Sequence, residues 1–292
     1  MSPRDFPAYA YLSLAWGLSF LLLLHVVDAF GWIGAVTFRC FIAGALLYVI
    51  AMAMRRRLDF GAGWLPFSIV GATTVAGQLV GLSYATPLIG TAMAAIFVAS
   101  IPLFSMVIAQ VWGLERITPA RVLGLALGTI GIIMLVGFPA VPVTATFLLG
   151  CAAMVGSTFS AAFGSNYASR HLSGTGPWEV TIGSFIAGGI LTLPLLWFVP
   201  VPGAPAAMDY LYLVALAALM SALTYVLYFG LVKSIGATAA ISVEFVVTVV
   251  AVLVGALVLD EPLTMLQLVG GAVIIAGCAL VLGLVRPVRA AA

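Results

Sequence analysis

Charged residues are scarce in this sequence. Only 7% of its 292 residues are Asp, Glu, Lys or Arg, whereas soluble domains carry about 25%. Because 64% of the residues are apolar, water could not solvate the surface of such a chain. The formal net charge of +2 is too small to indicate a nucleic acid or another polyanion as partner. These scarcities exclude an ordinary soluble domain and favour a chain surrounded by lipid.

Cysteine and histidine are also rare. The three cysteines, Cys40, Cys151 and Cys278, lie inside apolar runs without paired spacing, so we interpret them as packing residues rather than disulfide or metal ligands. His25 and His171 fall on opposite membrane sides in the topology derived below, so they cannot share a metal site. The sequence has no GxxxxGK[ST] loop, which disfavours ATP-driven transport by this chain alone. We expect no cofactor and no enzymatic activity. A membrane-embedded enzyme or lipid-modifying protein is the alternative from another class.

Long apolar runs make up most of what is present. A hydrocarbon core about 30 Å thick needs about 20 apolar residues per helix, which leaves room for about ten crossings. The runs predict spans near residues 8–27, 31–54, 62–84, 88–112, 119–138, 145–169, 178–199, 209–232, 237–258 and 263–285. They are continuously apolar rather than alternating, which argues against a membrane barrel. We predict an all-α polytopic membrane protein whose first helix is not cleaved.

Basic residues predict how the spans are oriented. Ten spans place both termini on one side, and ten of the eleven Lys and Arg residues fall there: Arg4, Arg55, Arg56, Arg57, Arg116, Arg121, Arg170, Lys233, Arg286 and Arg289. The loops on the other side carry acids, such as Asp28, Asp209, Asp260 and Glu261. The positive-inside rule therefore predicts that both termini are cytoplasmic.

The second half of the chain repeats the first at an offset of 146 residues. The matches pair Ile89, Gly90, Glu115, Thr118, Gly124, Ala126, Gly131 and Gly137 with Ile235, Gly236, Glu261, Thr264, Gly270, Ala272, Gly277 and Gly283. Because each half has an odd number of spans, the second copy must enter the membrane from the opposite side. We therefore predict two inverted five-helix repeats, residues 1–140 and 141–292. Inverted repeats are typical of transporters that work by alternating access.

Several short motifs also resemble a known family. They are Trp16-Gly17, Phe38-Arg39, Pro102, and the turn Leu114-Glu115-Arg116-Ile117-Thr118 before Gly124 and Gly131, which recurs as Leu259-Asp260-Glu261-Pro262-Leu263-Thr264 before Gln267, Gly270 and Gly277. In order and spacing, over the whole chain, they resemble the EamA-type ten-helix exporters of the drug/metabolite transporter superfamily. This resemblance implies an inner-membrane exporter of small metabolites, in a branch that includes exporters of aromatic amino acids. Pro262 replaces Arg116 in the second turn, so the two turns are not chemically equivalent.

Two charges inside the apolar runs are the first functional candidates. Glu244 lies about seven residues into the ninth span, where a charge costs a few kcal/mol unless it is paired, protonated or hydrated. It suits a proton carrier or a site for a substrate ammonium, and a bond to a neighbouring hydroxyl is the structural alternative. Arg39 lies about 12 Å into the second span and could meet a solute carboxylate, Asp28 or backbone carbonyls. The two charges lie in opposite halves of the bilayer, which argues against a direct pair.

Other polar and aromatic side chains of the central helices complete the predicted solute path: Trp16, Ser19, Gln78, Tyr84, Ser160, Phe163, Asn166, Tyr225 and Tyr228. The repeat aligns Gln78 with Thr224, which predicts that the third and eighth helices form opposite walls of one site. Interfacial anchoring is the alternative for the Trp and Tyr rings. Pro87 and Pro102 could kink or interrupt the fourth span and free carbonyls for the path.

The remaining motif residues have structural explanations. Glu115 and Glu261 stand where helices begin, and an acid there complements the positive helix end. The small residues Gly124, Gly128, Gly131, Gly270, Gly271 and Gly277 allow helices to approach closely, either within the chain or in a homodimer through the fifth and tenth helices. We predict a secondary exporter of small amphipathic metabolites, amino acids including aromatic ones, in a bacterial inner membrane. A multidrug or other metabolite carrier of the same fold is the alternative.

Overall fold

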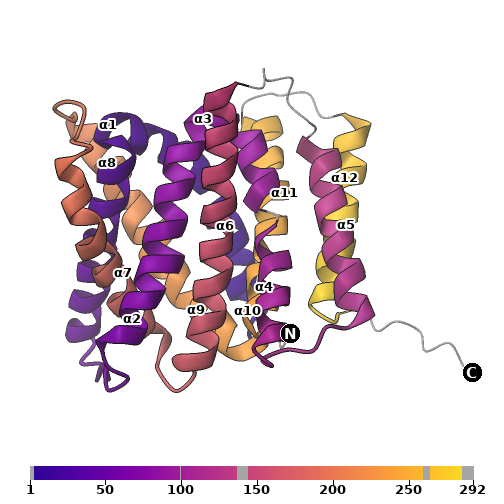
Figure 1. Cartoon of the computed structure of the whole chain (residues 1–292), viewed down its shortest axis with the longest axis horizontal. Coiled ribbons are helices and arrows are strands. Elements are labelled where there is room, and N and C mark those ends of the chain that lie inside the picture. The colour runs from indigo at the N-terminus through magenta and orange to yellow at the C-terminus, as the bar shows by residue number, and fades with distance from the viewer. Residues whose placement is uncertain (1–2, 99, 137–143, 259–263, 285–292) are drawn as a thin grey trace, which may run out of the picture.

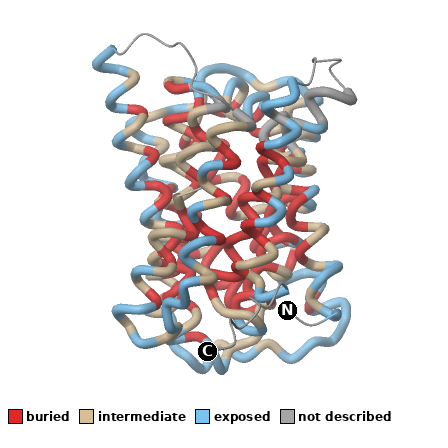
Figure 2. The backbone as a smooth tube through the Cα atoms, turned by 90° about the vertical axis from the view of Figure 1, so that its right-hand side faces the viewer, coloured by how far each residue is buried: buried red, intermediate tan, exposed pale blue. Residues whose placement is uncertain are grey.

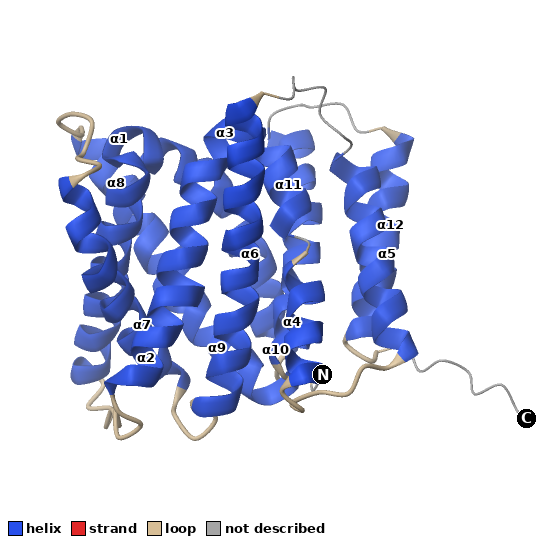
Figure 3. Ribbon diagram, in the orientation of Figure 1, coloured by secondary structure: helices blue, strands red, loops and turns tan. Residues whose placement is uncertain are grey.

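The computed structural model describes residues 3–98, 100–136, 144–258 and 264–284, and in these ranges every regular element is a helix (Figures 1 and 3). Five segments are long and apolar enough to cross a membrane: Leu22–Ala53, Trp64–Gly90, Ala145–His171, Pro177–Trp197 and Ala207–Ile235. Shorter apolar helices accompany them: Ile96–Val111, Pro119–Met134, Ala237–Val250 and Leu268–Val281. The predicted all-α polytopic membrane fold is confirmed.

The first two predicted spans lie in one continuous element, α1 (Phe6–Ala53). We expected a loop between them near residues 28–30. The structure does separate two helices close to this position, but the break is a single residue, Gly31, whose φ of 71° and ψ of 162° are not helical. Glycine adopts this conformation at little cost because it has no Cβ. Gly31 therefore takes the place of the loop that we expected between the two spans.

The third and fourth spans are also divided differently from the prediction. The third comprises α2 (Trp64–Val70), the π-helix η1 (Gly71–Gly77) and the start of α3 (Gln78–Val98). Pro87 lies inside α3, and the backbone breaks at Gly90, with φ 81° and ψ 156°, rather than near residues 85–87. Pro102 lies in the first turn of α4 (Ile101–Val111), where its missing amide hydrogen costs no hydrogen bond. It therefore starts a helix instead of kinking one.

The rest of the chain follows the predicted order of spans. Its elements are α5 (Pro119–Val136), α6 (Ala145–His171), α7 (Pro177–Thr192), the 3-10 helix η2 (Leu193–Trp197), α8 (Ala207–Ala217), the π-helix η3 (Ala218–Ala222), α9 (Leu223–Ile235), α10 (Ala237–Ile241), α11 (Val243–Val258) and α12 (Met265–Val281). The motif residues Gly137, Asp260, Glu261 and Pro262, and the basic residues Arg286 and Arg289, lie outside the described residues.

Irregular backbone recurs at the same offset as the sequence repeat. At the offset of 146 residues, the π-helix η1 of the first half falls on the π-helix η3 of the second half. Gly90 aligns with Gly236, and both have positive φ, 81° and 86°. The two halves therefore share departures from ideal helix geometry as well as matching residues.

The helices stand side by side, and their connections gather at two ends (Figure 1). The loops 54–63, 112–118 and 172–176 lie at the lower end in Figure 3, together with the start of α1, whereas the loop 198–206 lies at the upper end. The sequence places Arg55, Arg56, Arg57 and Arg116 in these lower loops. Buried residues concentrate in the middle of the bundle in Figure 2. Large apolar side chains such as Leu65, Val111 and Trp197 are exposed outside it, where lipid would cover them.

Helices α5 and α12 pack together through their glycines. A Cβ added to Gly124 would lie 2.7 Å from the Gly277 carbonyl oxygen, and one added to Gly131 would lie 2.8 Å from the Gly270 carbonyl oxygen. The repeat pairs Gly124 with Gly270 and Gly131 with Gly277, so the contact is reciprocal between the two halves. These four glycines therefore serve packing within one chain. A homodimer through other faces of the two helices stays a prediction.

Candidate functional site

Six of the predicted site residues line one cavity in the interior of the bundle. Its walls come from α1, α3, α9 and α11, with the lining residues Trp16, Ser19, Leu23, Arg39, Gln78, Leu79, Leu82, Val98, Tyr225, Glu244 and Val247. The cavity volume is about 50 Å³, which is enough for a few water molecules and far less than the about 300–1,000 Å³ of ligand sites. A solute such as an amino acid would therefore fit only after the surrounding helices separate.

Glu244 lies in the first turn of α11 and is 7% exposed. The hydroxyl of Thr248 donates to its backbone carbonyl oxygen at 3.1 Å, but its carboxylate accepts no hydrogen bond from another described residue. The structural alternative, a carboxyl group bonded to a neighbouring hydroxyl, is therefore not what the structure shows. Because Glu244 lines the cavity, a cationic group of a solute there would meet an acid with no competing partner.

Arg39, from the second part of α1, is 5% exposed and lines the same cavity. Its Nε donates to Ser221 Oγ, and its Nη2 donates to the Met220 carbonyl oxygen at 3.2 Å. Among the partners expected from the sequence, it has therefore taken a backbone carbonyl rather than Asp28. No ion pair joins Arg39 to Glu244 in the described ranges, as their depths in the sequence predicted. The cavity is thus lined by one basic and one acidic side chain that form no ion pair with each other in the described ranges.

Aromatic rings form one wall of the cavity. The ring of Trp16 lies 5.7 Å from that of Tyr225 and 5.6 Å from that of Tyr228. Tyr225 also packs edge-on against Phe185 at 4.8 Å. Tyr228 adjoins the wall without lining the cavity, and its hydroxyl donates to Ser165 Oγ at 2.7 Å. The indole ring of Trp16 and the phenol ring of Tyr225 thus add aromatic surface to the cavity that Arg39 and Glu244 also line.

The other predicted site residues do not line this cavity, and their place on a solute path stays a prediction. Tyr84 packs against Trp32, with ring centroids 5.0 Å apart. Ser160 lies beside Gly77 of η1. Phe163 is one ring of a row along α6 and contacts Trp112 at 5.3 Å. The sequence analysis chose these residues because they are polar or aromatic and lie in the central helices. The side of the helix on which each one lies depends on tertiary packing.

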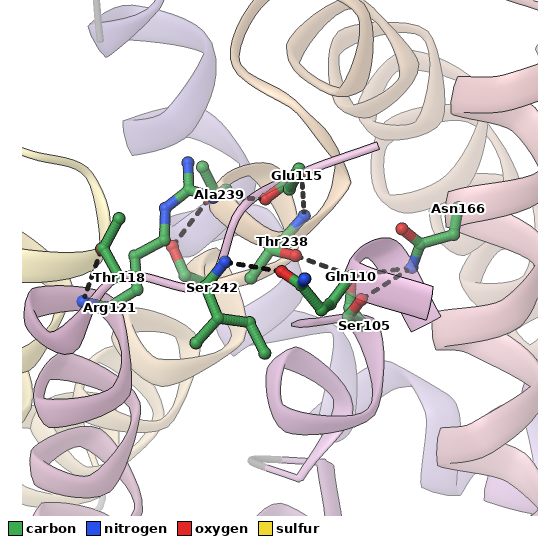
Figure 4. Close-up of polar contacts among 10 residues, drawn as sticks. Ser105, Gln110, Glu115, Thr118, Arg121, Asn166, Thr238, Ala239 and Ser242 are labelled. Carbon is green, nitrogen blue, oxygen red and sulfur yellow. Dashed lines mark hydrogen bonds and ion pairs between the residues drawn. The ribbon is translucent and has the colours of Figure 1, made fainter. Parts of the chain in front are cut away.

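Asn166, the last predicted site residue, belongs to a second polar group. Its Nδ2 donates to Ser105 Oγ at 2.9 Å and to the Ser105 carbonyl oxygen at 3.2 Å (Figure 4). It also donates to the Ala162 carbonyl oxygen at 2.9 Å. Its Oδ1 is buried and has no hydrogen-bond partner among the described residues. Ser105 Oγ in turn lies 3.3 Å from Thr238 Oγ1. Asn166 therefore joins α6 to α4, and Ser105 joins α4 to α10.

Glu115 connects the same group to α5. Its Oε1 accepts a hydrogen bond from the Thr238 amide at 3.3 Å, and its Oε2 accepts one from Arg121 Nη1 at 2.6 Å. The acid therefore lies at the first turn of α10, whereas Thr118 Oγ1 accepts the Arg121 amide, at 3.3 Å, at the start of α5. Glu115 does complement a helix end, but the helix belongs to the other half of the chain. We call Ser105, Glu115, Arg121, Asn166 and Thr238 the end cluster, because Glu115 lies in one of the lower loops.

Sequence reasoning missed several residues of the site. Ser221 and Met220, which hold Arg39, belong to η3, and a π-helical turn has no signal in an apolar sequence. The repeat offered one indirect clue, because it aligned Thr224 with Gln78 and so indicated this part of the eighth span. The apolar lining residues, such as Leu79 and Val247, are indistinguishable in sequence from residues that face lipid.

The sequence model of the EamA-like transporter family matches residues 8–137 and 148–283. An uncharacterized transporter of Archaeoglobus fulgidus is 25% identical over 269 residues, which cover 90% of this chain and 92% of that protein. A probable terminal-alkyne amino-acid exporter of Streptantibioticus cattleyicolor is 27% identical over 277 residues, which cover 92% of this chain and 90% of that protein.

The fold also matches a solved structure over nearly its whole length. A protein of known crystal structure aligns with a TM-score of 0.80 at 18% sequence identity. The alignment covers 98% of this chain and 100% of that one. At this identity the likeness concerns the fold alone.

Proposed function

The chain belongs to the EamA-like transporter family and is a membrane transporter, and from that premise we propose that it exports small amphipathic metabolites, amino acids including aromatic ones. The observation that carries the proposal is the cavity that Arg39 and Glu244 both line without forming an ion pair in the described ranges. An amino acid has a carboxylate and an ammonium group on one carbon, so it can satisfy both. The rings of Trp16 and Tyr225 would receive its side chain.

Energetics favour a ligand of this kind. A charged side chain at membrane depth costs about 3 kcal/mol by insertion scales. The carboxylate of Glu244 has no described partner that offsets this cost, and a bound ammonium would offset it. A probable amino-acid exporter among the relatives is consistent with the same substrate class. The presence of both an acidic and a basic side chain in one cavity favours a zwitterion over a singly charged drug.

Transport would proceed by alternating access between the two halves, residues 1–140 and 141–292. The inverted repeat is supported by the helix irregularities, because each half has a π-helix and a positive-φ glycine at equivalent positions. The end cluster joins α4 and α5 of the first half to α6 and α10 of the second. These contacts must separate when the cavity opens towards that end. We propose that the end cluster is the closed gate of this conformation.

The gate would face the cytoplasm. The lower loops and adjacent helix ends carry the basic residues of the described chain, apart from Arg39, and basic residues stay on the cytoplasmic side of an inner membrane. We therefore propose a bacterial inner-membrane location with both termini cytoplasmic. A homodimer through α5 and α12 would use the faces of these helices that the glycine contacts leave open.

The proposal is tested by solute flux in sealed proteoliposomes that contain the purified chain. A panel of amino acids and cationic dyes is measured with and without a pH gradient. We expect movement of aromatic amino acids, and an effect of the gradient would indicate proton coupling. Transport of dyes without amino acids would support the multidrug alternative, and no flux of any solute would refute export by this chain.

A matched pair of variants tests the role of Glu244. Glu244→Gln removes the negative charge and should strongly reduce amino-acid flux or change its pH dependence. Glu179→Gln makes the same change at another buried carboxylate, in the first turn of α7 and outside the cavity, and should leave selectivity unchanged. Equal rates for Glu244→Gln and the unmodified chain between pH 5 and 8 would remove Glu244 from the mechanism.

A further inference from the structure

The π-helix η3 provides two hydrogen-bond acceptors for Arg39, the arginine that lines the cavity. Ser221 is fully buried, and its hydroxyl donates to the Leu216 carbonyl oxygen, five residues earlier, at 2.9 Å. The same hydroxyl oxygen accepts the Nε hydrogen of Arg39, and the adjacent Met220 carbonyl oxygen accepts a hydrogen from Nη2. One edge of the guanidinium is therefore fixed by two neighbouring groups of a single helical turn.

The other edge of Arg39 remains available to a ligand. Nη1 makes no hydrogen bond to a described residue, while Arg39 forms part of the cavity wall. Guanidinium groups bind carboxylates through donors in a fixed planar arrangement. An arginine whose Nε and Nη2 are already bound can therefore orient its remaining donors without the loss of side-chain freedom that a long flexible side chain normally suffers.

Comparison of the two halves separates this feature from the needs of the fold. The first half has the same π-helical turn, η1, in which Val75 stands at the position of Ser221. The residue equivalent to Arg39 is Phe185, in α7 of the second half. Thr74, at the position of Met220, has a buried hydroxyl with no partner among the described residues. The turn itself recurs without a charge to bind, so the serine and arginine are not required to form it. This asymmetry indicates a task that only the second turn performs.

We propose that Ser221 is a positioning residue that fixes Arg39 for recognition of the carboxylate of the transported solute. The inference rests on the proposed function, because it assumes that the cavity binds an amino acid. Ser221 acts through Arg39 and does not touch the solute. Its loss should weaken recognition of a carboxylate without altering recognition of the rest of the molecule. The π-helical turn then serves selectivity, because it places a hydroxyl and a carbonyl oxygen side by side.

The test compares L-phenylalanine with phenethylamine, which has the same ring and amine but no carboxylate. Proteoliposome flux is measured for Ser221→Ala, for Ser221→Thr, and for the control Ser184→Ala. Ser184 is a fully buried serine whose hydroxyl donates only to the Thr181 carbonyl oxygen of its own helix, at 3.2 Å. Thermal unfolding of each purified variant in detergent verifies that it is folded.

We expect Ser221→Ala to raise the KM for phenylalanine about tenfold, the factor that loss of one hydrogen bond to a charged group produces. The KM for phenethylamine should stay unchanged, Ser221→Thr should restore the original ratio of the two, and Ser184→Ala should not alter it. An equal loss for both solutes in Ser221→Ala would show a merely structural role and overturn the proposal.

Arg39→Gln separates failure of this inference from failure of the proposed function. If Arg39→Gln abolishes the preference for phenylalanine while Ser221→Ala keeps it, the carboxylate site stands and the positioning role of Ser221 is refuted. If neither variant changes the preference, Arg39 does not bind the carboxylate of the solute, and both the inference and the zwitterion site are refuted.

Discussion

The contact between α5 and α12 makes a quantitative prediction, because backbone atoms rather than side chains limit it. A Cβ added to Gly277 would lie 2.6 Å from the Gly124 carbonyl oxygen and 2.7 Å from the Gly128 amide nitrogen. Neither atom can rotate away as a side chain would, so the two helices must move apart. Such overpacking costs about 1–3 kcal/mol. For a chain of this size, Gly277→Ala should lower Tm by roughly 2–10 °C.

Gly156→Ala is the matched control. Gly156 lies on an exposed face of α6, and a Cβ there would meet no atom within 4 Å. Alanine is favoured over glycine in a helix by about 0.5–1 kcal/mol, so this variant should keep or slightly raise Tm. The same substitution is therefore expected to act with opposite sign at the two positions.

Thermal unfolding of detergent-purified protein, followed by tryptophan fluorescence, measures both variants. Adding Gly124→Ala to Gly277→Ala should lower Tm by less than the sum of the single effects, because the first methyl group already separates the helices. A Tm for Gly277→Ala equal to that of the unmodified chain would refute the close glycine contact. It would also remove the main packing evidence that the two halves meet reciprocally.

Three further predictions concern the cavity, the helix break at Gly90 and the end cluster. Trp16→Leu should raise the KM for phenylalanine more than that for alanine, because only the aromatic side chain needs the ring, and an equal effect on both would exclude Trp16 from selectivity. Gly90→Ala should destabilise the fold by about 1–3 kcal/mol through its backbone conformation alone, since a Cβ there meets no described atom within 4 Å, and an unchanged Tm would contradict this. Asn166→Ala should open the end cluster, so that a cysteine placed at Ser19 in a background without the native cysteines reacts faster with an impermeant thiol reagent added from the cytoplasmic side. An unchanged labelling rate would argue against the gate.

Much of the fold could be predicted from the sequence because lipid imposes a simple rule. A segment that crosses hydrocarbon must satisfy its backbone internally and remain apolar over its whole length, so apolar runs identify helices without knowledge of their neighbours. The helix breaks were harder to predict. Gly31 and Gly90 replace two expected loops, because one glycine with positive φ can end one helix and begin another without polar residues.

The candidate site was predicted only in part. Arg39 and Glu244 were identifiable because an ionisable residue inside an apolar span is costly unless it has a partner or a function. The structure brings both to one cavity. Asn166 satisfied the same argument from polarity but lies in the end cluster, because polarity shows that a residue avoids lipid and does not show which interior group it joins.

The sequence by itself determined that the chain is an all-helical membrane protein and that its two halves resemble each other, because these depend on local hydropathy and residue identity. The tertiary structure decided which faces of the helices meet. It paired the glycines of α5 with those of α12, placed Glu115 at the start of α10 and held Arg39 against η3. All sides of a membrane helix are apolar, so hydropathy cannot distinguish a face that packs from a face that meets lipid. Only the close fit between helices makes that distinction, and it brought Arg39 and Glu244 to one cavity.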